Sequence, residues 1–156
     1  MSGHPGTLAS VSLSTSELTV TAERSPSREE MSALATELVN FNEAFRPDFL
    51  PRELSAWIRE PGGSPLGGAL ASHHWGWMHI SHLWVPEHLR GQGFGRRLIE
   101  ALEQLARSEG CVGAHVDTFD FQARGFYETL GYTRFGSIED YPEGSALHFL
   151  SKRLTP

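Results

Sequence analysis

The N-terminal part of the chain passes from a segment without hydrophobic periodicity to one with the periodicity of a helix. Residues 1–16 are rich in Ser, Thr, Gly and Pro, so we expect a flexible N-terminal segment and one folded domain over residues 17–156. Alternation with β-branched residues over 18–22 predicts a strand. After Ser27, helical spacing of apolar residues predicts a helix. These apolar residues are Met31, Leu34, Leu38 and Phe41.

From residue 54 the pattern becomes that of short strands. Three runs, over 54–59, 66–75 and 77–85, carry the composition of strands and are separated by turn signals. The first turn signal is the Pro and Gly cluster at 61–65, and the second is Gly76. We expect the three strands to pair as successive antiparallel hairpins.

A second helical pattern follows these strands. Apolar residues recur at helical spacing from Phe94 to Ala106, and Gly110 occupies the position expected for a C-terminal cap. Further along we expect a strand over 111–119, a short helix over 121–130 and two final strands. The final strands are predicted over 132–137 and 147–152. Hairpins followed by a β-α-β unit predict an α/β fold with a mixed sheet.

Composition and charge narrow the class of function. The chain has 13 basic and 19 acidic residues and a formal charge of −6, which argues against a nucleic-acid partner and favours a cationic small molecule. No stretch reaches the roughly 18 uninterrupted apolar residues of a membrane span, and the N-terminus lacks the layout of a signal peptide. We therefore expect a cytoplasmic protein without a membrane partner.

Cysteine and histidine positions give little indication of redox or metal chemistry. The single cysteine, Cys111, excludes an internal disulfide, and its place in an apolar run predicts a small core residue. His79 and His82 lie three apart on a predicted strand, where regular alternation places side chains on opposite faces. We therefore expect no metal site.

The most informative run joins the strand over 77–85 to the following helix. It reads Leu83-Trp84-Val85-Pro86-Glu87-His88-Leu89-Arg90-Gly91-Gln92-Gly93-Phe94-Gly95-Arg96-Arg97. The first amides of a helix have no internal acceptor, and the helix dipole favours negative charge beside them. The three glycines of the run remove side chains that would keep a pyrophosphate away from those amides. The run therefore predicts an anion-binding turn.

Two other glycine-rich nucleotide motifs fail on spacing. A Walker loop ends in Gly-Lys-Ser/Thr, whereas Gly95 is followed by Arg96, and the dinucleotide fingerprint requires a small residue at that same position. The spacing Arg90-x-x-Gly93-x-Gly95 instead resembles the signature of the GNAT superfamily of N-acetyltransferases. Downstream, Ala123-x-x-Phe126-Tyr127-x-x-Leu130-Gly131-Tyr132 resembles the family's second central motif. The two resemblances together cover residues 77–135.

The resemblance implies the GNAT, or acyl-CoA N-acyltransferase, fold, with a mixed, mostly antiparallel sheet of six to seven strands and flanking helices. It also implies acetyl-CoA as the acyl donor, bound through its pyrophosphate at the glycine turn. The strand that ends near Val85 would splay from its parallel neighbour at 114–119, and the pantetheine arm would pair with the exposed edge. The implied cofactor-binding residues are Leu83, Trp84, Val85, Arg90, Gly91, Gln92, Gly93, Gly95, Arg96, Gln122 and Phe126.

Acyl transfer to an amine needs a neutral amine and a proton for the departing thiolate. Tyr127 occupies the tyrosine of the family's Phe-Tyr pair, so the resemblance implies that it is the acid; the alternative is a core tyrosine. His79 lies where several relatives place a carboxylate that acts through water, and it is a candidate base or an ordinary strand histidine. Asp117 is the second candidate, as a base, as an anchor for a cationic amine or as a turn cap.

Further positions are candidates for contacts with the coenzyme or with the acceptor. Asp120 replaces an asparagine that commonly contacts the coenzyme in the family, and we expect it to cap a helix from Phe121, which leaves Gln122 for that contact. The resemblance also implies an acceptor pocket that draws on the segment after the first helix. Its candidate residues are Phe45, Asp48 and Phe49, one of Trp75, Trp77 and Trp84, and Tyr141 as a lid.

The sequence therefore predicts an acetyl-CoA-dependent N-acetyltransferase that acts without a metal on a primary amine of a small, cationic acceptor. The amine is expected to attack the thioester directly in a ternary complex. Two alternatives remain open: a catalytically silent acyl-CoA-binding or sensor module that uses the same turn, and a protein or peptide N-acetyltransferase. A homodimer is common among relatives and is a possible state of this chain.

Overall fold

The computed structural model describes residues 18–47 and 51–155, so the predicted flexible segment over 1–16 lies outside the described residues. Its contacts divide the chain into two units, Met1–Phe41 and Asn42–Pro156, and each is described by itself. The expected single domain over 17–156 stays a prediction. No helix in the described part of the chain is long and apolar enough to cross a membrane.

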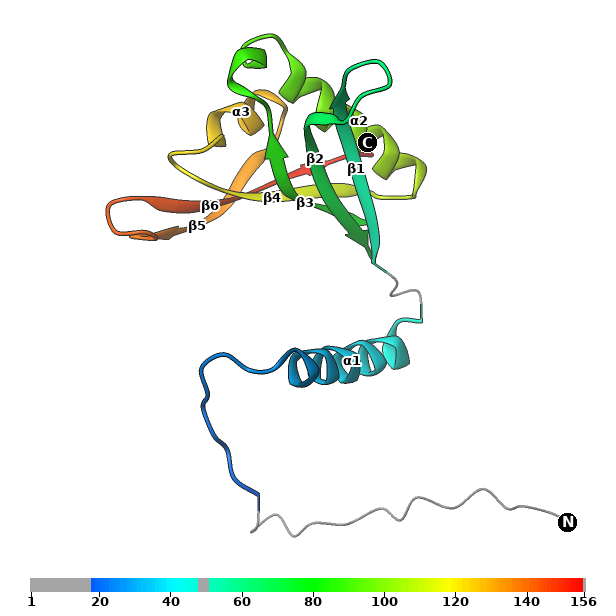
Figure 1. Cartoon of the computed structure of the whole chain (residues 1–156), viewed down its shortest axis with the longest axis vertical. Helices are drawn as coiled ribbons and strands as arrows, with labels where there is room; N and C mark the ends of the chain where they lie inside the picture. Colours follow the sequence, from blue (N-terminus) through cyan, green and yellow to red (C-terminus); the bar gives the residue numbers. More distant parts are fainter. Residues whose placement is uncertain (1–17, 48–50, 156) are drawn as a thin grey trace, which may run out of the picture. The chain divides into compact units, whose positions relative to one another are not determined.

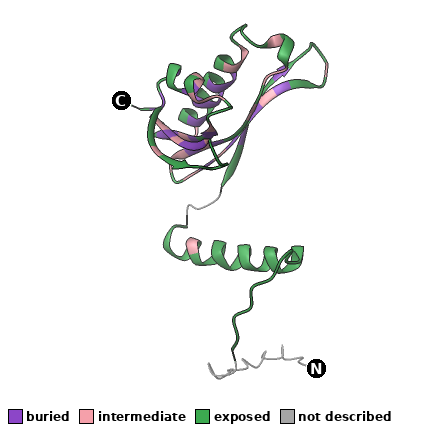
Figure 2. Cartoon of the chain, turned by 90° about the vertical axis from the view of Figure 1, so that its left-hand side faces the viewer, coloured by how far each residue is buried: buried purple, intermediate pink, exposed green. Residues whose placement is uncertain are grey.

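One long helix, α1 (Arg28–Phe45), contains most of the described residues of the first unit. It begins with a capping box, in which the Ser27 hydroxyl accepts a bond from the Glu30 amide at 3.1 Å and the Glu30 carboxylate accepts one from the Ser27 amide at 2.9 Å. The Ser27 hydroxyl also donates to the Glu30 carboxylate at 2.7 Å, and this bond, followed by the one from the Ser27 amide, lowers the pKa of Glu30. The predicted helix is confirmed, and none of its residues is buried (Figure 2).

The strand predicted over 18–22 is absent. Residues 18–23 have no regular secondary structure, and the ladders of the described sheet involve only residues between Arg52 and Arg153. Alternation favours a strand only where a neighbouring strand supplies hydrogen-bond partners, and no described strand pairs with this segment.

The second unit contains a six-stranded sheet in the order β1-β2-β3-β4-β6-β5 (Figure 1). Its strands are β1 (Arg52–Arg59), β2 (Pro65–His74), β3 (Trp77–Trp84), β4 (Gly113–Phe119), β5 (Thr133–Glu139) and β6 (Ala146–Arg153). Among the described strands, only β3 and β4 pair in parallel, and α2 (Phe94–Ser108) connects them. The predicted hairpins, the central β-α-β unit and the mixed α/β fold are therefore confirmed.

The core lies between α2 and one face of the sheet. Leu98, Ile99, Leu102 and Ala106 of α2 are buried, as are small residues on the facing strands, among them Ala69, Ala71 and Ala114 (Figure 2). Small side chains on the sheet let the helix approach closely. Cys111 is 1% exposed in this core, which confirms its predicted structural position, and burial raises the pKa of its thiol.

The short helix α3 (Arg124–Thr129) begins three residues later than the helix predicted over 121–130. Residues 120–123 form a turn instead, because Thr118 and Gln122 bond to the main chain there. The Gln122 side-chain oxygen accepts a bond from the Phe119 amide at 3.0 Å, and the Thr118 hydroxyl accepts one from the Ala123 amide at 3.3 Å. This turn brings α3 to the end of the sheet where β3 and β4 separate.

Candidate functional site

Strands β3 and β4 separate toward their carboxyl ends. Their pairing begins at Trp77 and Gly113 and ends at Ile80 and Val116, although β3 continues to Trp84 and β4 to Phe119. A cavity of about 1000 Å³ is lined by the separated ends of both strands, by the glycine turn before α2 and by α3. The edge of β3 beyond Ile80 is therefore placed to pair with an extended ligand, as an added strand would.

A bulge in β3 changes which residues share a face. The register with β2 shifts between Leu70 and Ala71, so Ser81 has no partner of its own, and its hydroxyl donates to the Leu70 carbonyl at 3.2 Å. His79 and His82 oppose residues two apart on β2 and therefore lie on the same face. The expectation that they point to opposite faces was wrong, because regular alternation does not continue through a bulge. Among the described residues, no group of three or more His, Cys, Asp or Glu side chains is arranged to hold a metal ion.

The glycine turn has the backbone of an anion-binding site. Gly91 and Gly93 have φ values of +72° and +81°, and Gly93 is the residue that precedes the first turn of α2. The amide of Arg97 donates to the Gly93 carbonyl at 3.1 Å. This is the first bond of the helix, so the amides of residues 94–96, which precede Arg97 in the chain, have no acceptor within the helix. All three of these residues line the cavity.

Two polar side chains brace this turn. Arg90 Nε donates to the Val85 carbonyl at 3.0 Å, and the guanidinium lies over the Trp84 ring, 5.1 Å from its centroid. Gln92 Nε2 donates to the His88 carbonyl at 2.8 Å, and Gln92 is not among the residues that line the cavity. The side chains of Arg90 and Gln92 therefore stabilise the turn.

Gly95 has a packing role in addition to the one expected from its sequence. A Cβ added at Gly95 would lie 3.2 Å from Cζ of Phe126, closer than ordinary van der Waals contact. The residue thus allows the first turn of α2 to approach α3. The sequence prediction treated all three glycines as openings for the pyrophosphate, and it could not detect this contact across 31 positions of the chain, from Gly95 to Phe126.

Tyr127 lies on α3 and lines the cavity, with 4% of its surface exposed. Burial raises the pKa of its phenol to about 12, and the nearby Asp117 carboxylate adds to the rise. The phenol is therefore protonated at neutral pH and is available as a hydrogen-bond donor. Its ring also packs edge-on against Phe126 and Tyr132, so the position of the hydroxyl is well supported.

Three ionisable side chains meet on the sheet face opposite α2. His79 Nε2 lies 3.1 Å from Asp117 Oδ1, and the His79 ring stacks on His115 with centroids 4.6 Å apart and an angle of 12°. Burial, followed by the influence of His79, lowers the pKa of His115. A neutral His115 can support the His79 ring without charge repulsion. His115 was not predicted, although it lies two residues before Asp117 on the same strand face.

Asp120 does not cap a helix, contrary to the sequence prediction. One of its carboxylate oxygens accepts a bond from the Ala146 amide at 2.8 Å, and the other pairs with Nε2 of the buried His148. The His148 bond is the main cause of the lowered pKa of Asp120. Gln122, which lines the cavity, caps the turn in its place. The cap was misassigned because the partners of Asp120 lie on β6, distant in sequence.

The structure brings most predicted site residues together. The cavity lining includes Leu83, Trp84, Val85, Arg90, Gly91, Gly93, Gly95, Arg96, Asp117, Gln122, Phe126 and Tyr127. His79 is connected to this set through its bond with Asp117. Phe121 also lines the cavity and was missed as a site residue, because we expected a helix there. Of the candidates near α1, Phe45 is exposed, and Asp48 and Phe49 lie outside the described residues.

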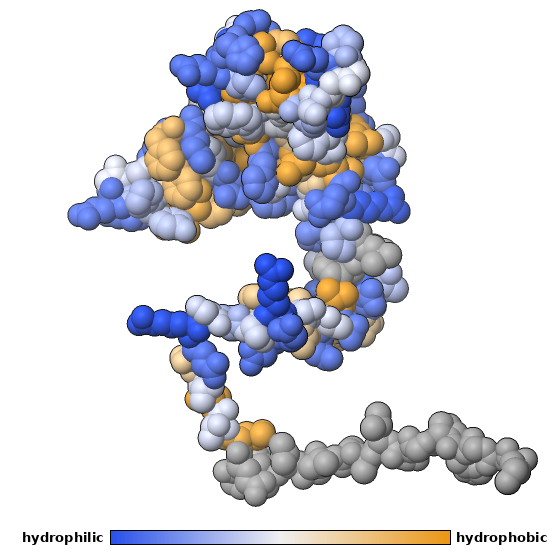
Figure 3. All heavy atoms as spheres, in the orientation of Figure 1, coloured by the Kyte–Doolittle hydropathy of each residue, from blue (hydrophilic) through white to orange (hydrophobic). Residues whose placement is uncertain are grey.

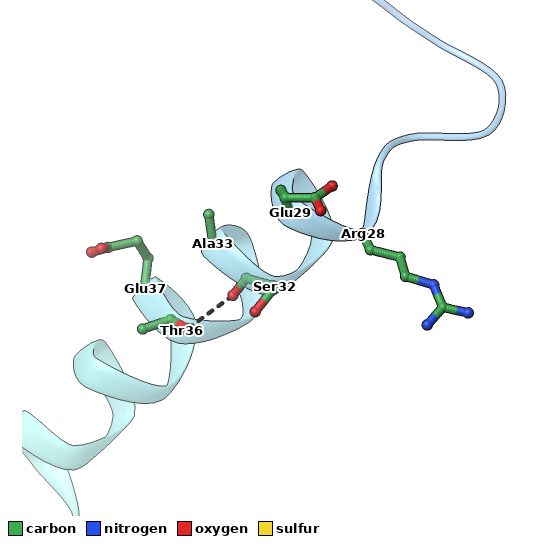
Figure 4. Close-up of a pocket in the computed structure, with 6 residues that line it drawn as sticks. All are labelled: Arg28, Glu29, Ser32, Ala33, Thr36 and Glu37. Carbon is green, nitrogen blue, oxygen red and sulfur yellow. Dashed lines mark hydrogen bonds between the residues drawn. The ribbon is translucent and has the colours of Figure 1, made fainter.

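A second hollow runs along α1 and consists of one flank of that helix. Figure 4 shows its side chains, and the bond drawn there is donated by the Thr36 hydroxyl to the Ser32 carbonyl at 2.9 Å. The lining residues are Arg28, Glu29, Ser32, Ala33, Thr36 and Glu37. This flank contains one cation, two carboxylates and small side chains, without the converging amides or buried groups of the sheet cavity. The sheet cavity is therefore the candidate active site.

Comparisons with known proteins agree with this geometry. The acetyltransferase (GNAT) family matches residues 18–132. The chain is 50% identical over 91 residues to the blasticidin-S acetyltransferase of Streptomyces morookaense, which is 57% of this chain and 67% of that protein. It is 35% identical over 125 residues to an acetyltransferase of Agrobacterium fabrum, which is 80% of this chain and 91% of that protein.

Solved structures give the same result for the fold. The crystal structure of an acetyltransferase from Agrobacterium tumefaciens superimposes with a TM-score of 0.81 at 32% identity, over 87% of this chain and 99% of that chain. A streptothricin acetyltransferase from Bacillus anthracis, crystallised with acetyl coenzyme A, shares the fold at a TM-score of 0.58 and 19% identity, over 67% of this chain and 64% of that chain. The chain is an enzyme that transfers acetyl groups, and it belongs to the GNAT family of acetyltransferases.

Proposed function

We propose that the protein transfers the acetyl group of acetyl-CoA to a primary amine of a small, cationic molecule by direct attack in a ternary complex. The observation that carries the proposal is the single cavity that joins the amides of the glycine turn to Tyr127 and Asp117. Such a cavity can hold the anionic end of the donor at the turn and bring its thioester to the separated strands.

The donor binds along the edge of β3. The coenzyme pyrophosphate accepts bonds from the main-chain amides at Gly93, Gly95 and Arg96, and the pantetheine arm pairs with β3 beyond Ile80. Arg90 acts indirectly by fixing the turn through the Val85 carbonyl. Main-chain amides of the same edge are the nearest donors for the oxygen of the tetrahedral intermediate.

The acceptor amine reaches the thioester from the sheet face opposite α2. A primary ammonium has a reference pKa of about 10.4, so a proton must leave before attack. His79 takes this proton, directly or through water, and Asp117 orients its imidazole and stabilises the imidazolium that forms. Asp117, with 46% of its side chain exposed, also attracts the cationic acceptor.

Tyr127 completes the transfer. The amine nitrogen bonds to the carbonyl carbon to form the tetrahedral intermediate, whose carbon–sulfur bond then breaks so that a thiolate leaves. A coenzyme thiol with a pKa of about 8.5 is a stronger acid than a phenol with a pKa of about 12, so Tyr127 stabilises the thiolate chiefly by donating a hydrogen bond. The nitrogen loses a second proton when the amide forms, and this proton balances the one gained by the thiol, whereas the proton taken up earlier by His79 is released to solvent.

The acceptor is proposed from the relatives and from the charge of the site. The blasticidin-S acetyltransferase shares half of its residues with this chain over the aligned region, so blasticidin S is the first acceptor to test. Asp117 at the acceptor side and the net charge of −6 favour cationic amines in general. Polyamines, aminoglycosides, amino acids and peptides complete the panel.

The test measures release of free thiol from acetyl-CoA with each amine of the panel, together with the mass of the product. We expect thiol release with a cationic small amine, and a product heavier by one acetyl group. Calorimetry with coenzyme A gives an independent measurement of donor binding. Heat on coenzyme binding without thiol release for any amine would contradict the proposed transfer, and absence of heat would remove the donor site as well.

A further inference from the structure

Two aromatic side chains stand beside Asp117 on the acceptor side of the site. Asp117 and Phe119 lie two residues apart on β4 and therefore share one face of the sheet, whereas the intervening Thr118 is buried on the other face. Phe119 stacks on Phe121, with centroids 5.1 Å apart and ring planes only 7° from parallel. The Asp117 carboxylate is thus two residues along β4 from Phe119, the first ring of the stacked pair.

Tyr141, from the turn between β5 and β6, adds a third ring. It lies edge-on to Phe119, with centroids 5.6 Å apart and an angle of 73°. We call Phe119, Phe121 and Tyr141 the aromatic platform. Phe121 and Tyr141 are 68% and 52% exposed, and Phe121 also lines the cavity. Figure 3 shows hydrophobic side chains gathered over the end of the second unit where the β5–β6 hairpin lies.

The exposed ring of Phe121 stands on a well-braced turn. The neighbouring Asp120 makes two bonds to Ala146: its amide donates to the Ala146 carbonyl at 3.1 Å, and its carboxylate accepts from the Ala146 amide at 2.8 Å. On the other side, Gln122 accepts the bond from the Phe119 amide at 3.0 Å. A ring held in this way loses little conformational entropy when a ligand stacks on it, which favours binding.

The surroundings of the platform are acidic. Asp117 lies beside Phe119 on the strand, and Asp140 and Glu143 flank Tyr141 closely in the β5–β6 turn. Aromatic faces attract cations, and carboxylates nearby strengthen this preference. The combination therefore suits a ligand that carries both a flat ring and a positive charge.

We propose that the aromatic platform binds a planar ring of the acceptor, while Asp117 holds the amine that is to be acetylated. This inference rests on the proposed function of the site and names the class of acceptor. Two residues of a strand span roughly 7 Å, so the ring and the amine are joined by a short arm of a few atoms. An amine on a short arm from an aromatic or heteroaromatic ring fits this arrangement better than an open-chain polyamine.

The experiment compares phenethylamine with cyclohexylethylamine, which have the same charge and arm but differ in the planarity of the ring. Binding of each amine to the full-length protein saturated with coenzyme A is measured by calorimetry, so that the result does not depend on turnover. We expect phenethylamine to bind at least about tenfold more tightly. Phe121→Leu should abolish this difference in affinity between the two amines, and Phe121→Tyr should retain it.

Phe135→Leu is the matched control, because Phe135 is a phenylalanine of similar exposure, 67%, on β5 and outside the cavity lining. It should leave the ratio unchanged. Equal affinities of the two amines, no measurable binding of either, or a ratio that survives Phe121→Leu would each overturn the platform. A ring preference without thiol release from any amine would instead contradict acetyl transfer, so the two proposals fail separately.

Discussion

Tyr127 has a buried phenol in the cavity, and its environment keeps it protonated far above neutral pH. We predict that Tyr127→Phe lowers kcat by about 10²-fold or more, because the leaving thiolate loses its donor. Coenzyme A binding by calorimetry should be nearly unchanged, since the ring and its packing are retained. A kcat equal to that of the unaltered enzyme at every pH would assign Tyr127 to the core alone.

Asp120 gives a prediction about stability and pH. Its pKa is lowered in the folded protein, chiefly by the hydrogen bond with His148. The ionised carboxylate therefore stabilises the fold at pH values above the unfolded pKa of about 3.9. That contribution is lost as the pH falls through the folded pKa. Asp120→Asn should therefore lower Tm at neutral pH, and the difference in Tm should shrink as the pH is lowered below about 4.

The measurement for Asp120 is thermal unfolding followed by circular dichroism across this pH range. Asp140→Asn serves as the control, since Asp140 is an exposed aspartate of the β5–β6 turn. A difference in Tm for Asp120→Asn that stays constant down to low pH would show that the carboxylate charge is not the source of the stabilisation.

The glycine turn is an element whose backbone determines its function. Gly93 has a φ of +81°, and a Cβ there would meet no atom within 4 Å, so the cost of Gly93→Ala is conformational, about 1–2 kcal/mol. Relief of that strain moves the amides at the start of α2. We expect the Kd for coenzyme A, measured by calorimetry, to rise about tenfold.

Gly125→Ala is the comparison for the glycine turn. Gly125 lies in α3, has ordinary φ, and an added Cβ would also meet nothing within 4 Å. Alanine favours a helix over glycine by about 1 kcal/mol, so this variant should be as stable as the parent or more so, with unchanged coenzyme affinity. Equal affinities of both variants would argue against a role for the backbone conformation at position 93.

Helix α2 joins the site to the core, and its two faces differ. Leu102 is fully buried against the sheet, whereas Leu105 is 39% exposed. Leu102→Ala should reduce the free energy of unfolding by about 2–5 kcal/mol, because it removes buried methyl groups and leaves a cavity. Leu105→Ala should change it by less than about 1 kcal/mol. Urea denaturation measures both, and similar losses would contradict the assignment of the buried face.

The hydrophobic core belongs to the second unit. All residues of its main hydrophobic cluster lie between Leu54 and Leu154, and α1 has no buried residue. We predict that a chain beginning at Asn42 unfolds cooperatively and binds coenzyme A with an affinity close to that of the full chain. Thermal unfolding and calorimetry test this, and a broad, non-cooperative transition would show that the first unit is needed for the fold.

Much of the fold was predictable because its signals are local. The periodicity from Phe94 to Ala106, the turn signals at 61–65 and the glycines before α2 each act within a few residues of chain. The prediction of a strand over 18–22 was wrong, because a strand also needs a neighbouring strand, distant in the sequence, to pair with. The helix expected from Phe121 was shortened, because Thr118 and Gln122 satisfy main-chain amides in a turn.

Local patterns in the sequence predicted the glycine turn, because the φ requirements of glycine and the first amides of a helix are properties of short segments. The resemblance to the GNAT motifs implied the class of enzyme and most of the cofactor-binding residues that line the cavity. Which side chains meet depends instead on the assembled fold. The pair of His79 and Asp117, the bulge at Ser81 and the stack of Phe119 on Phe121 depend on register and packing between elements. Such contacts arise from the assembled sheet, and no local pattern encodes them.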